Sequence, residues 1–325
     1  MKMHFIIEIV NGIIDDVENF VLVKVLESKP SEYSYSMIDK VDLEEFIKHT
    51  KSIDFKNSIP VGSIDFVKKY LEIVHSVRDI EPLEIPKELR CDKYLKRTYL
   101  IVDKNEIPRE GGCFLKYASK LKSFTYTGEI SRLFKDVDSS SVLKDGKYVI
   151  SERVELLSEY RCFILNDDIK GIQFYEGDCT VTLGQNDIAL IKEMIMDYAK
   201  NERRPKAYTL DVAITKDRGV ILLECHNHSS VGLYGYDNEI LPYHYKFGFE
   251  WYLKNNGYRL EKCINEQDSM KDGYLKFSFG YIGEVDNDVF WHGELEHLKK
   301  KAGPISSIFT LREAIELKRI LEYKE

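Results

Sequence analysis

Two acidic residues that face each other across a predicted β-hairpin are the strongest chemical signal in the sequence. Residues 207–215 and 220–225 are strand-like segments joined by the polar, glycine-containing turn 216–219. A symmetric pairing places Asp211 opposite Glu224, and side chains paired in this way have Cβ atoms about 4.5–5.5 Å apart. Two like charges at this separation destabilise a sheet. Either a Mg²⁺ ion bound by both carboxylates neutralises them, or each acid pairs with a Lys or Arg elsewhere in the fold.

The same register decides which side chains of the hairpin are buried. It forms an apolar face from the pairs Leu210–Cys225, Val212–Leu223 and Ile214–Ile221. It also pairs Thr209 with His226 beside the two acids. A one-residue shift, which a bulge at Gly219 would allow, puts Val212 opposite Glu224 and breaks the apolar face, so we expect the symmetric register.

A polar loop follows directly after the second of these strands. Residues 224–235 contain His226, Asn227, His228 and several serines and glycines, as expected of a loop that holds a ligand. His226 and His228 are spaced for one face of a strand, but a zinc site needs two more ligands. We therefore expect a ligand-binding loop here rather than a zinc site.

The N-terminal part of the chain is expected to form a small α/β unit. An apolar run at 5–10 is followed by the turn sequence Asn11-Gly12, and a short helix is expected at 42–49. Ser63 is placed to cap a helix that runs to about residue 75. This alternation of strand and helix is typical of a small α/β domain.

A linker with two prolines, residues 79–90, leads into the segments that must position the acidic hairpin. The expected strands are 99–102, 113–116, 148–150 and 154–157, with a further hairpin that joins 160–165 to 169–175. The expected helices and tail elements are a helix at 187–200, a helix at 243–254 that stops at Gly257, a strand-like segment at 274–282 and a final helix that starts at Thr310.

The composition narrows the class of protein. The 325 residues carry a net charge of −8, which argues against general nucleic-acid binding. No window approaches the ~20 apolar residues of a membrane helix. The six cysteines form no C-x-x-C pair, so we expect reduced thiols in a cytoplasmic protein rather than a zinc site. Residues 87–135 carry twelve Lys and Arg against six Asp and Glu, which favours binding of one compact anion.

A series of short motifs runs in order through residues 90–240. The motifs are Ser151-Glu152, Ser158-Glu159-Tyr160-Arg161, Gly171, Tyr175-Glu176-Gly177-Asp178, Leu210-Asp211-Val212, Leu223-Glu224 and Gly232-Leu233-Tyr234-Gly235. Together they resemble the ATP-grasp superfamily and are most similar to its R2K clade, which is frequent in phage and bacterial genomes. The resemblance implies a mixed α+β and α/β architecture: an ATP-grasp fold of two α+β subdomains that clasp ATP, preceded by a small α/β pre-ATP-grasp domain.

The resemblance also implies domain boundaries. The expected domains are an N-terminal α/β domain at 1–88, a nucleotide-binding subdomain at 89–157, a metal-binding and catalytic subdomain at 158–260, and a C-terminal appendage of unknown role at 261–325.

Several residues are implicated in nucleotide binding by the same resemblance. Lys116 matches a lysine that contacts nucleotide phosphates, and Lys96 or Arg97 matches an earlier basic contact. Residues 117–127 stand where a mobile loop covers the phosphates, although they are nearly free of glycine. Glu152, with the backbone that follows it, matches the hinge that holds adenine and ribose. The nucleotide-binding residues expected in this way are Lys96, Lys116, Lys122, Glu152, Val154 and Glu159.

The resemblance assigns catalytic and metal-binding roles as well. Arg161 and Lys116 are the expected catalytic residues, with Arg161 near the transferred phosphate. The expected ligands of Mg²⁺ are Asp211, Glu224, His226 and Asn227. The family pattern Glu-x-Asn has its Asn two residues after the Glu, where this chain has His226. Because Mg²⁺ prefers oxygen to imidazole, metal binding is expected to be weaker or Mn²⁺ better tolerated.

Each of these side chains also has a purely structural interpretation. Lys116 is equally typical of a surface lysine at the end of a strand. Arg161 and Glu159 could form an ion pair on one face of a sheet, and Glu152 could be a solvated turn residue.

The function implied by the resemblance is an ADP-forming ligase that joins a carboxylate to an amine. The carboxylate takes the γ-phosphate of ATP to give an acyl phosphate, and the amine then displaces phosphate, with Mg²⁺ as the metal. The expected partners are small-molecule or peptide acids and amines, with neither nucleic acid nor membrane. The alternatives are a non-catalytic or regulatory ATP-binding protein, in which His226 marks a decayed metal site, and a phage structural or interaction protein.

Overall fold

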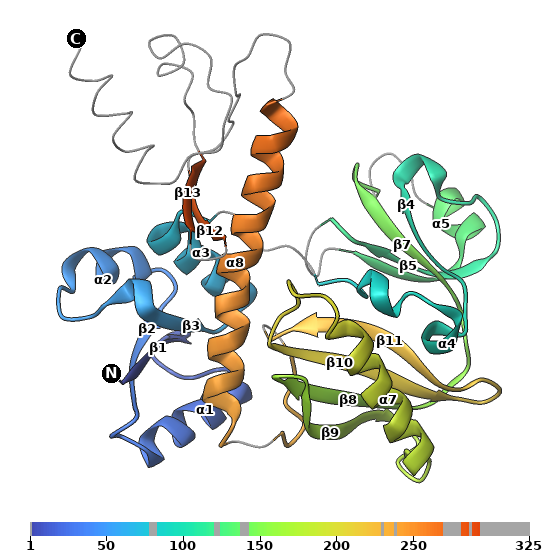
Figure 1. Cartoon of the computed structure of the whole chain (residues 1–325), viewed down its shortest axis with the longest axis horizontal. Helices are drawn as coiled ribbons and strands as arrows, with labels where there is room; N and C mark the ends of the chain where they lie inside the picture. The colour runs from blue at the N-terminus through green and yellow to red at the C-terminus, as the bar shows by residue number, and fades with distance from the viewer. Residues whose placement is uncertain are drawn as a thin grey trace. The chain divides into compact units, whose positions relative to one another are not determined.

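The computed structural model describes residues 2–77, 83–119, 124–136, 143–228, 231–236, 239–268, 281–285 and 288–292 (Figure 1). The chain divides into two compact units, one made of residues 1–80 with 245–325 and the other of residues 81–244. Lys122, most of the strand-like segment 274–282 and the helix expected from Thr310 lie outside the described residues.

The first unit contains a three-stranded parallel sheet in the order β2-β1-β3. Its elements are β1 (Met3–Ile9), α1 (Val17–Ser28), β2 (Tyr33–Asp39), α2 (Leu43–His49), β3 (Ser58–Val61) and α3 (Ile64–His75). The expected α/β unit is therefore confirmed. Asn11 and Gly12 form the expected turn, and both have positive φ.

Helix α3 begins where the sequence predicts. The Ser63 hydroxyl accepts a hydrogen bond from the Phe66 backbone N–H at 3.2 Å, which satisfies one of the amides that a helix start leaves free. The helix buries Phe66, Val67, Tyr70 and Leu71, which recur at helical spacing.

Helix α8 (Leu241–Asp268) is longer than the sequence suggests, so the predicted stop at Gly257 is wrong. A single glycine in a helix interior costs only about 1 kcal/mol relative to alanine, which is too little to end a helix by itself. The strands β12 (Tyr281–Val285) and β13 (Asp288–His292) pair as a hairpin, and β12 overlaps the end of the strand-like segment expected at 274–282.

The second unit begins with a four-stranded antiparallel sheet in the order β4-β7-β5-β6. Its elements are β4 (Tyr99–Asp103), β5 (Gly112–Tyr117), β6 (Thr125–Glu129), α5 (Ile130–Asp136) and β7 (Lys147–Glu152). One face carries the buried core around Leu115, Ile130 and Ile150. Strand β6 takes up the end of the segment 117–127, which the sequence analysis treats as a loop.

A second antiparallel sheet in this unit has the order β11-β10-β8-β9. Its strands are β8 (Leu156–Leu165), β9 (Asp168–Gly177), β10 (Ala207–Thr215) and β11 (Gly219–Asn227). The same part of the unit contains the short helix α4 (Asp92–Leu95) and the helix α7 (Gln185–Tyr198). Both predicted hairpins and the predicted helix at 187–200 are confirmed. The separate strand expected at 154–157 is wrong, because only its last two residues are extended and they begin β8.

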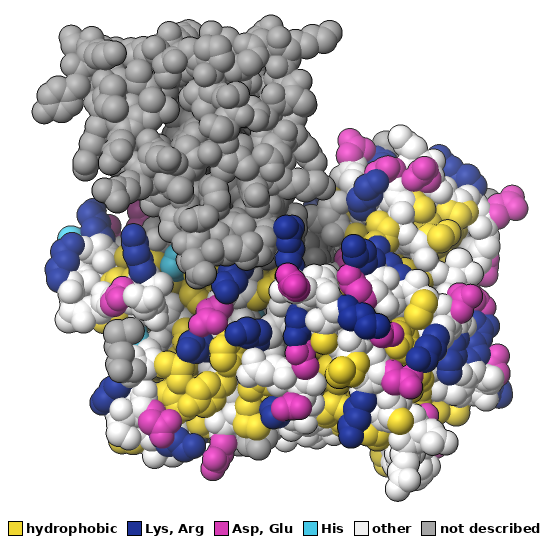
Figure 2. Space-filling view, in the orientation of Figure 1, with side chains coloured by type: hydrophobic (Ala, Val, Ile, Leu, Met, Phe, Trp, Pro, Cys, Tyr) yellow, Lys and Arg dark blue, Asp and Glu magenta, His cyan; other side chains and the backbone are white. Residues whose placement is uncertain are grey.

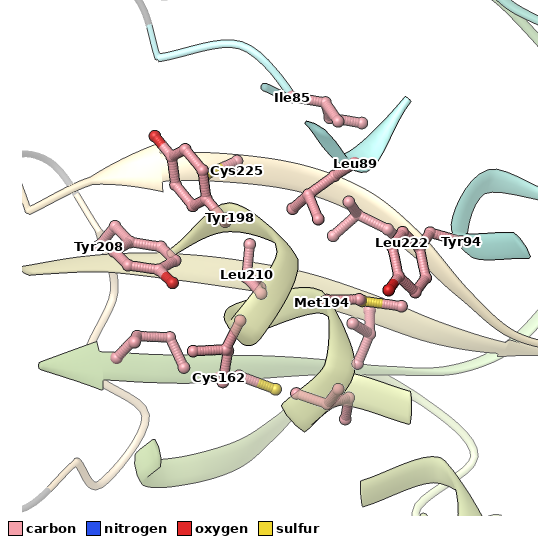
Figure 3. Close-up of a cluster of buried hydrophobic side chains, with 14 of the residues drawn as sticks. Ile85, Leu89, Tyr94, Cys162, Met194, Tyr198, Tyr208, Leu210, Leu222 and Cys225 are labelled. Atoms are coloured by element: carbon pink, nitrogen blue, oxygen red, sulfur yellow. The ribbon is translucent and has the colours of Figure 1, made fainter. Parts of the chain in front are cut away.

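Helix α7 covers one face of this second sheet. Figure 3 shows Met194 and Tyr198 of the helix gathered with Cys162, Leu210 and other apolar side chains of the strands. Met194, Cys162 and Leu210 are fully buried. Because side chains alternate along a strand, the neighbours of these residues point to the opposite face, which carries the candidate site.

The register of the β10–β11 hairpin agrees with the prediction only in part. Asp211 pairs with Glu224 as expected, but beyond this pair Val212 lies opposite Leu222, which leaves Leu223 as the extra residue of a β-bulge. The predicted pairs Val212–Leu223 and Ile214–Ile221 are therefore wrong. Ile221 and Leu222 are both fully buried, so both faces of this part of the hairpin are covered and the apolar pattern does not fix the register.

The surface of the described residues mixes charges of both signs. In the view of Figure 2, Lys and Arg side chains are interspersed with Asp and Glu and with apolar areas. Among the described helices, none combines the length and the apolar character that a membrane crossing requires.

Candidate functional site

A row of four polar side chains crosses the second sheet on the face opposite α7. Glu224 on β11, Asp211 on β10, Arg161 on β8 and Gln173 on β9 are direct neighbours in the strand register. Regular pairing of four strands therefore brings together residues that are up to 63 positions apart in the sequence. Asp211 and Glu224 meet as the predicted pairing of the hairpin requires. Arg161 joins them from β8, which the hairpin alone does not predict.

Arg161 and Asp211 form a bidentate ion pair at the centre of this row. Arg161 donates from Nε to Asp211 Oδ1 at 2.9 Å and from Nη2 to Oδ2 at 2.7 Å. Asp211 is only 2% exposed. Burial by itself raises the pKa of this carboxyl, but the hydrogen bonds from Arg161 and His226 outweigh it and hold the pKa below its usual range. Asp211 is therefore an anion, and Arg161 fixes its orientation.

His226 lies between the two acids. Its Nε2 is 2.7 Å from Glu224 Oε2 and 3.5 Å from Asp211 Oδ2. Burial lowers the pKa of this imidazole, but the hydrogen bonds and negative charges of the two acids outweigh it and raise the pKa to about 9. The pKa of Glu224 is lowered to about 2, because His226 and Lys116 outweigh the effect of burial. At neutral pH the imidazolium therefore supplies the positive charge between the carboxylates.

The three side chains can also hold a metal ion. One ligand atom from each of Asp211, Glu224 and His226 lies within 4.8 Å of the others. Two carboxylates on adjacent strands are the donors that Mg²⁺ uses, and each keeps lone pairs beyond those used in its present ion pairs. The donor set therefore fits a divalent cation, provided that the proton on His226 leaves.

A pocket adjoins this cluster between the two sheets of the second unit. Its polar lining includes Arg97, Lys116 and Glu84 along with Glu224, and its apolar lining includes Phe114 and other side chains. The remaining lining residues are Ile85, Tyr99, Val149, Ser151, Leu223 and Cys225. A pocket with apolar walls and a few convergent charged groups is the usual form of a small-molecule site.

Lys116 joins the pocket to the acidic cluster. Its Nζ is 3.6 Å from Glu224 Oε1 and 3.2 Å from Glu84 Oε1. Burial lowers the pKa of this amine, but the two carboxylates outweigh it and raise the pKa above its usual value. The side chain is 19% exposed, so it is not the solvated lysine of the structural interpretation.

The two candidates for the earlier basic contact, Lys96 and Arg97, have separate positions. Lys96 donates to the backbone carbonyl of Arg218 at 2.9 Å, in the turn between β10 and β11. Arg97 lines the pocket and donates to Ser151 Oγ at 2.8 Å and to the carbonyl of Leu222 at 2.6 Å. These acceptors carry no net charge, so the geometry favours Arg97 over Lys96 as a cation available to the pocket.

The predicted hinge lies in the segment between β7 and β8. Glu152 ends β7, and Arg218 donates to its two carboxylate oxygens at 2.7 and 3.0 Å. Val154 is half-buried in the irregular segment between the sheets. Glu152 is therefore held by an ion pair in this structure rather than solvated.

Two tyrosine rings lie close to the guanidinium of Arg161. The guanidinium carbon of Arg161 is 5.3 Å from the ring centre of Tyr175 and 5.4 Å from that of Tyr234. Tyr175 donates to Glu159 Oε2 at 2.7 Å. Glu159 therefore accepts a hydrogen bond from Tyr175, and Arg161 forms its ion pair with Asp211 rather than with Glu159.

Asn227 is placed apart from the acidic cluster. It pairs with Tyr208 in the register and follows His226 directly, so it belongs to the opposite face of β11. No motif in the sequence points to Glu84, Tyr99 or Arg218. Glu84 lies in a linker rich in charged residues and prolines, and its partners come from strands that lie further along the chain.

Comparison with known proteins identifies the domain that carries this site. Residues 94–241 match the family described as ATP-grasp domain, R2K clade family 2. The match includes Lys116, Arg161 and the three residues of the acidic cluster. No curated protein sequence matches the chain.

Solved structures of ligases show only remote similarity to the chain. D-alanine–D-alanine ligase from Bacillus anthracis complexed with ATP is 14% identical with a TM-score of 0.44, over 78% of this chain and 95% of that one. Macrocyclase MdnC from Microcystis aeruginosa, bound with precursor peptide MdnA, is 13% identical with a TM-score of 0.41, over 76% and 98%.

Proposed function

We propose that this chain, whose residues 94–241 are an ATP-grasp domain of the R2K clade, is an ATP-dependent ligase that joins a carboxylate to an amine. The observation that carries the proposal is the position of the acidic cluster. Asp211, Glu224 and His226 adjoin, through Lys116, a pocket with apolar walls that is lined mostly by residues of the matched segment. The pocket provides a place for the adenine base, Lys116 provides positive charge for the phosphates, and Asp211 and Glu224 provide carboxylates for a metal.

Each side chain has a defined part in the proposed reaction. Lys116 and Arg97 bring positive charge to the nucleotide, and Arg161 holds Asp211 in one orientation. Asp211 and Glu224 would bind Mg²⁺, which neutralises the phosphate charge when it is bound. A carboxylate oxygen of the acid substrate attacks the γ-phosphorus while ADP leaves. The amine then attacks the acyl carbon, phosphate leaves with the bonding electrons, and the amine loses a proton.

The substrates are proposed only by class, as a small-molecule or peptide acid and an amine. Phosphoryl transfer depends mainly on positioning and charge neutralisation, which the cluster provides, rather than on a protein nucleophile. No such nucleophile is part of the proposal.

A direct test measures ADP release from Mg·ATP in the presence of pooled amino acids and short peptides. We expect release that depends on both an acid and an amine and that is lost in Asp211→Asn. Glu155→Gln is a matched control, because Glu155 is exposed and pairs with Lys216 away from the cluster. ATP binding without ADP release in any acid and amine pool would contradict the ligase proposal.

The second candidate is a regulatory nucleotide-binding protein, and one observation favours it. The protonated His226 already supplies positive charge between the two carboxylates. In that case nucleotide would bind with an affinity that is independent of divalent cations.

A further inference from the structure

Helix α1 of the first unit is apolar on two opposite faces, but the described residues cover only one of them. The covered face packs toward β2, and its buried residues are Asn19, Leu22, Val23, Val25 and Leu26. On the other face Val17 is 71% exposed and Phe20 is 51% exposed. A helix that is apolar all round is normally buried all round. The outer face of α1 is therefore suited to pack against another apolar surface.

The turn before α1 extends this outer face. Val10 and Ile13 exchange two backbone hydrogen bonds, at 2.8 and 3.2 Å, across the turn Asn11-Gly12. Residues paired in this way carry their side chains on the same side, and these two are 41% and 64% exposed. Figure 2 shows apolar side chains gathered over this turn and over α1. We call the side chains of Val10, Ile13, Val17 and Phe20 the α1 patch.

Charged side chains of opposite sign stand at the two ends of the α1 patch. Asp15 and Asp16 lie directly before Val17, at the amino end of the helix. Lys24 follows Phe20 by one helical turn, and its Nζ lies 5.4 Å from the centre of the Phe20 ring. The aliphatic stem of Lys24 therefore continues the apolar stripe, while its charge ends it.

This order of charges makes the surface complementary to a second copy of itself. If two α1 helices pack antiparallel around a two-fold axis at Phe20, Lys24 of each copy comes beside Asp15 and Asp16 of the other. The helix dipoles then also run in opposite directions, whereas parallel helices would bring like charges together. We propose that the α1 patch is the centre of a homodimer interface in which the α1 helices pack antiparallel. This inference does not depend on the proposed ligase activity.

The size of the α1 patch indicates a reversible dimer. A stable interface buries about 800 Å² on each partner, with an apolar core inside a polar rim. The four side chains of the α1 patch suit such a core, and the acids and Lys24 suit its rim. Because the core is small, we expect a dissociation constant of about 1–100 µM.

Sedimentation equilibrium of the full chain between about 1 and 200 µM measures this constant. We expect the mass to rise toward twice that of a single chain. In the double variant Val17→Ala with Phe20→Ala the constant should rise about 30-fold or more, because each substitution acts on both sides of the interface and alanine keeps the helix. Met196→Ala is a matched control, because Met196 is an exposed apolar residue of a helix in the second unit. It should leave the constant unchanged.

Reversal of charges tests the antiparallel orientation. Lys24→Glu alone, or Asp15→Lys alone, places like charges beside each other across the two-fold axis, so each should raise the dissociation constant about tenfold. The two substitutions together restore opposite charges, and the constant should return to within about threefold of its original value. Asp16 stays unchanged in all variants because its side chain caps α1. Melting temperatures check that each variant is folded.

Three results would overturn the proposal. A protein that stays monomeric over the whole range has no such interface, and a sharp fall of its melting temperature in the double alanine variant would identify other residues of the same chain as the cover of the α1 patch. A dimer whose dissociation constant the alanine substitutions leave unchanged uses another surface. A dimer that both charge reversals weaken further when they are combined does not have antiparallel α1 helices.

Discussion

Replacement of His226 by Asn should change how metal binding depends on pH. The His226 side chain lies 2.7 Å from Glu224 Oε2 and has a pKa of about 9. A divalent cation that binds both acids must displace this imidazolium or take its place as a ligand of the neutral ring. A ring displaced from the two acids returns toward the ordinary histidine pKa of 6.5 and is mostly neutral above pH 7, so in either case one proton leaves when the metal binds.

The size of the change in Mg²⁺ affinity with pH follows from the pKa of His226. At pH 7, two units below about 9, roughly one molecule in a hundred has a neutral imidazole. The apparent affinity for Mg²⁺ should therefore rise about ninefold from pH 7 to pH 8 and about fivefold from pH 8 to pH 9, or about 50-fold in all, which equals about 2.3 kcal/mol. In His226→Asn the amide has no such proton, so its affinity should be nearly flat over this range and higher at pH 7.

Calorimetric titration of Mg²⁺ into the nucleotide-bound protein at pH 7, 8 and 9 measures this dependence. His49→Asn is a matched control, because His49 also contacts a carboxylate, Glu45 Oε2 at 2.9 Å, but is exposed and lies in the first unit. This control should keep the pH dependence of the intact protein. An intact protein whose Mg²⁺ affinity does not depend on pH, or a His226→Asn variant that keeps the same slope, would refute the release of a proton from His226.

Three other substitutions test the site and its supporting fold. Asp211→Asn breaks the buried pair with Arg161, so we expect a loss of about 3 kcal/mol in the free energy of unfolding, measured in urea, together with loss of the Mg²⁺-dependent rise in melting temperature. An unchanged melting response to Mg²⁺ would count against the metal assignment. Gly177→Ala should lower the melting temperature more than Gly111→Ala, because both glycines have positive φ, at 94° and 100°, but only at Gly177 would a Cβ clash with the backbone oxygen of Leu157 on β8. Equal losses in the two variants would show that the contact relaxes. Glu224 has a pKa lowered to about 2, so its stabilising effect is complete above about pH 4.5 and is lost as the pH falls toward 2. Glu224→Gln should therefore flatten the acid-unfolding curve in this window, and a curve of unchanged steepness would contradict the ion pairs described for Glu224.

The parts of the site that could be predicted from the sequence depend on local pattern. The pairing of Asp211 with Glu224 follows from alternation along two strands joined by a short turn, and the start of α3 follows from the cap at Ser63. Such features are specified by residues close together in the chain. The bulge at Leu223 was missed because both faces of that part of the hairpin are buried, so the apolar pattern allows more than one register.

The residues that were missed act across long distances in the sequence. Arg97 reaches the carbonyls of Leu222 and Leu223, which are 125 and 126 positions away. Glu84 meets Lys116 only because the linker packs against the second sheet while Lys116 lies on the first. No spacing rule connects these segments, and their contacts depend on how the two sheets of the unit pack together.

The charges of the site couple the binding of nucleotide and metal. Three carboxylates, on Glu84, Asp211 and Glu224, are in contact with three cations, on Lys116, Arg161 and His226. This set is neutral while His226 is protonated, and the bonds of Arg97 described above add a cation whose acceptors are uncharged. The pocket therefore attracts an anion, but a triphosphate brings more negative charge than one arginine balances. A divalent cation that enters with the phosphates removes this excess, and since coupling between two ligands is reciprocal, nucleotide must strengthen metal binding by the factor by which metal strengthens nucleotide binding. A nucleotide affinity that is independent of Mg²⁺ would therefore place the phosphates away from Asp211 and Glu224, and would favour the regulatory alternative over the ligase.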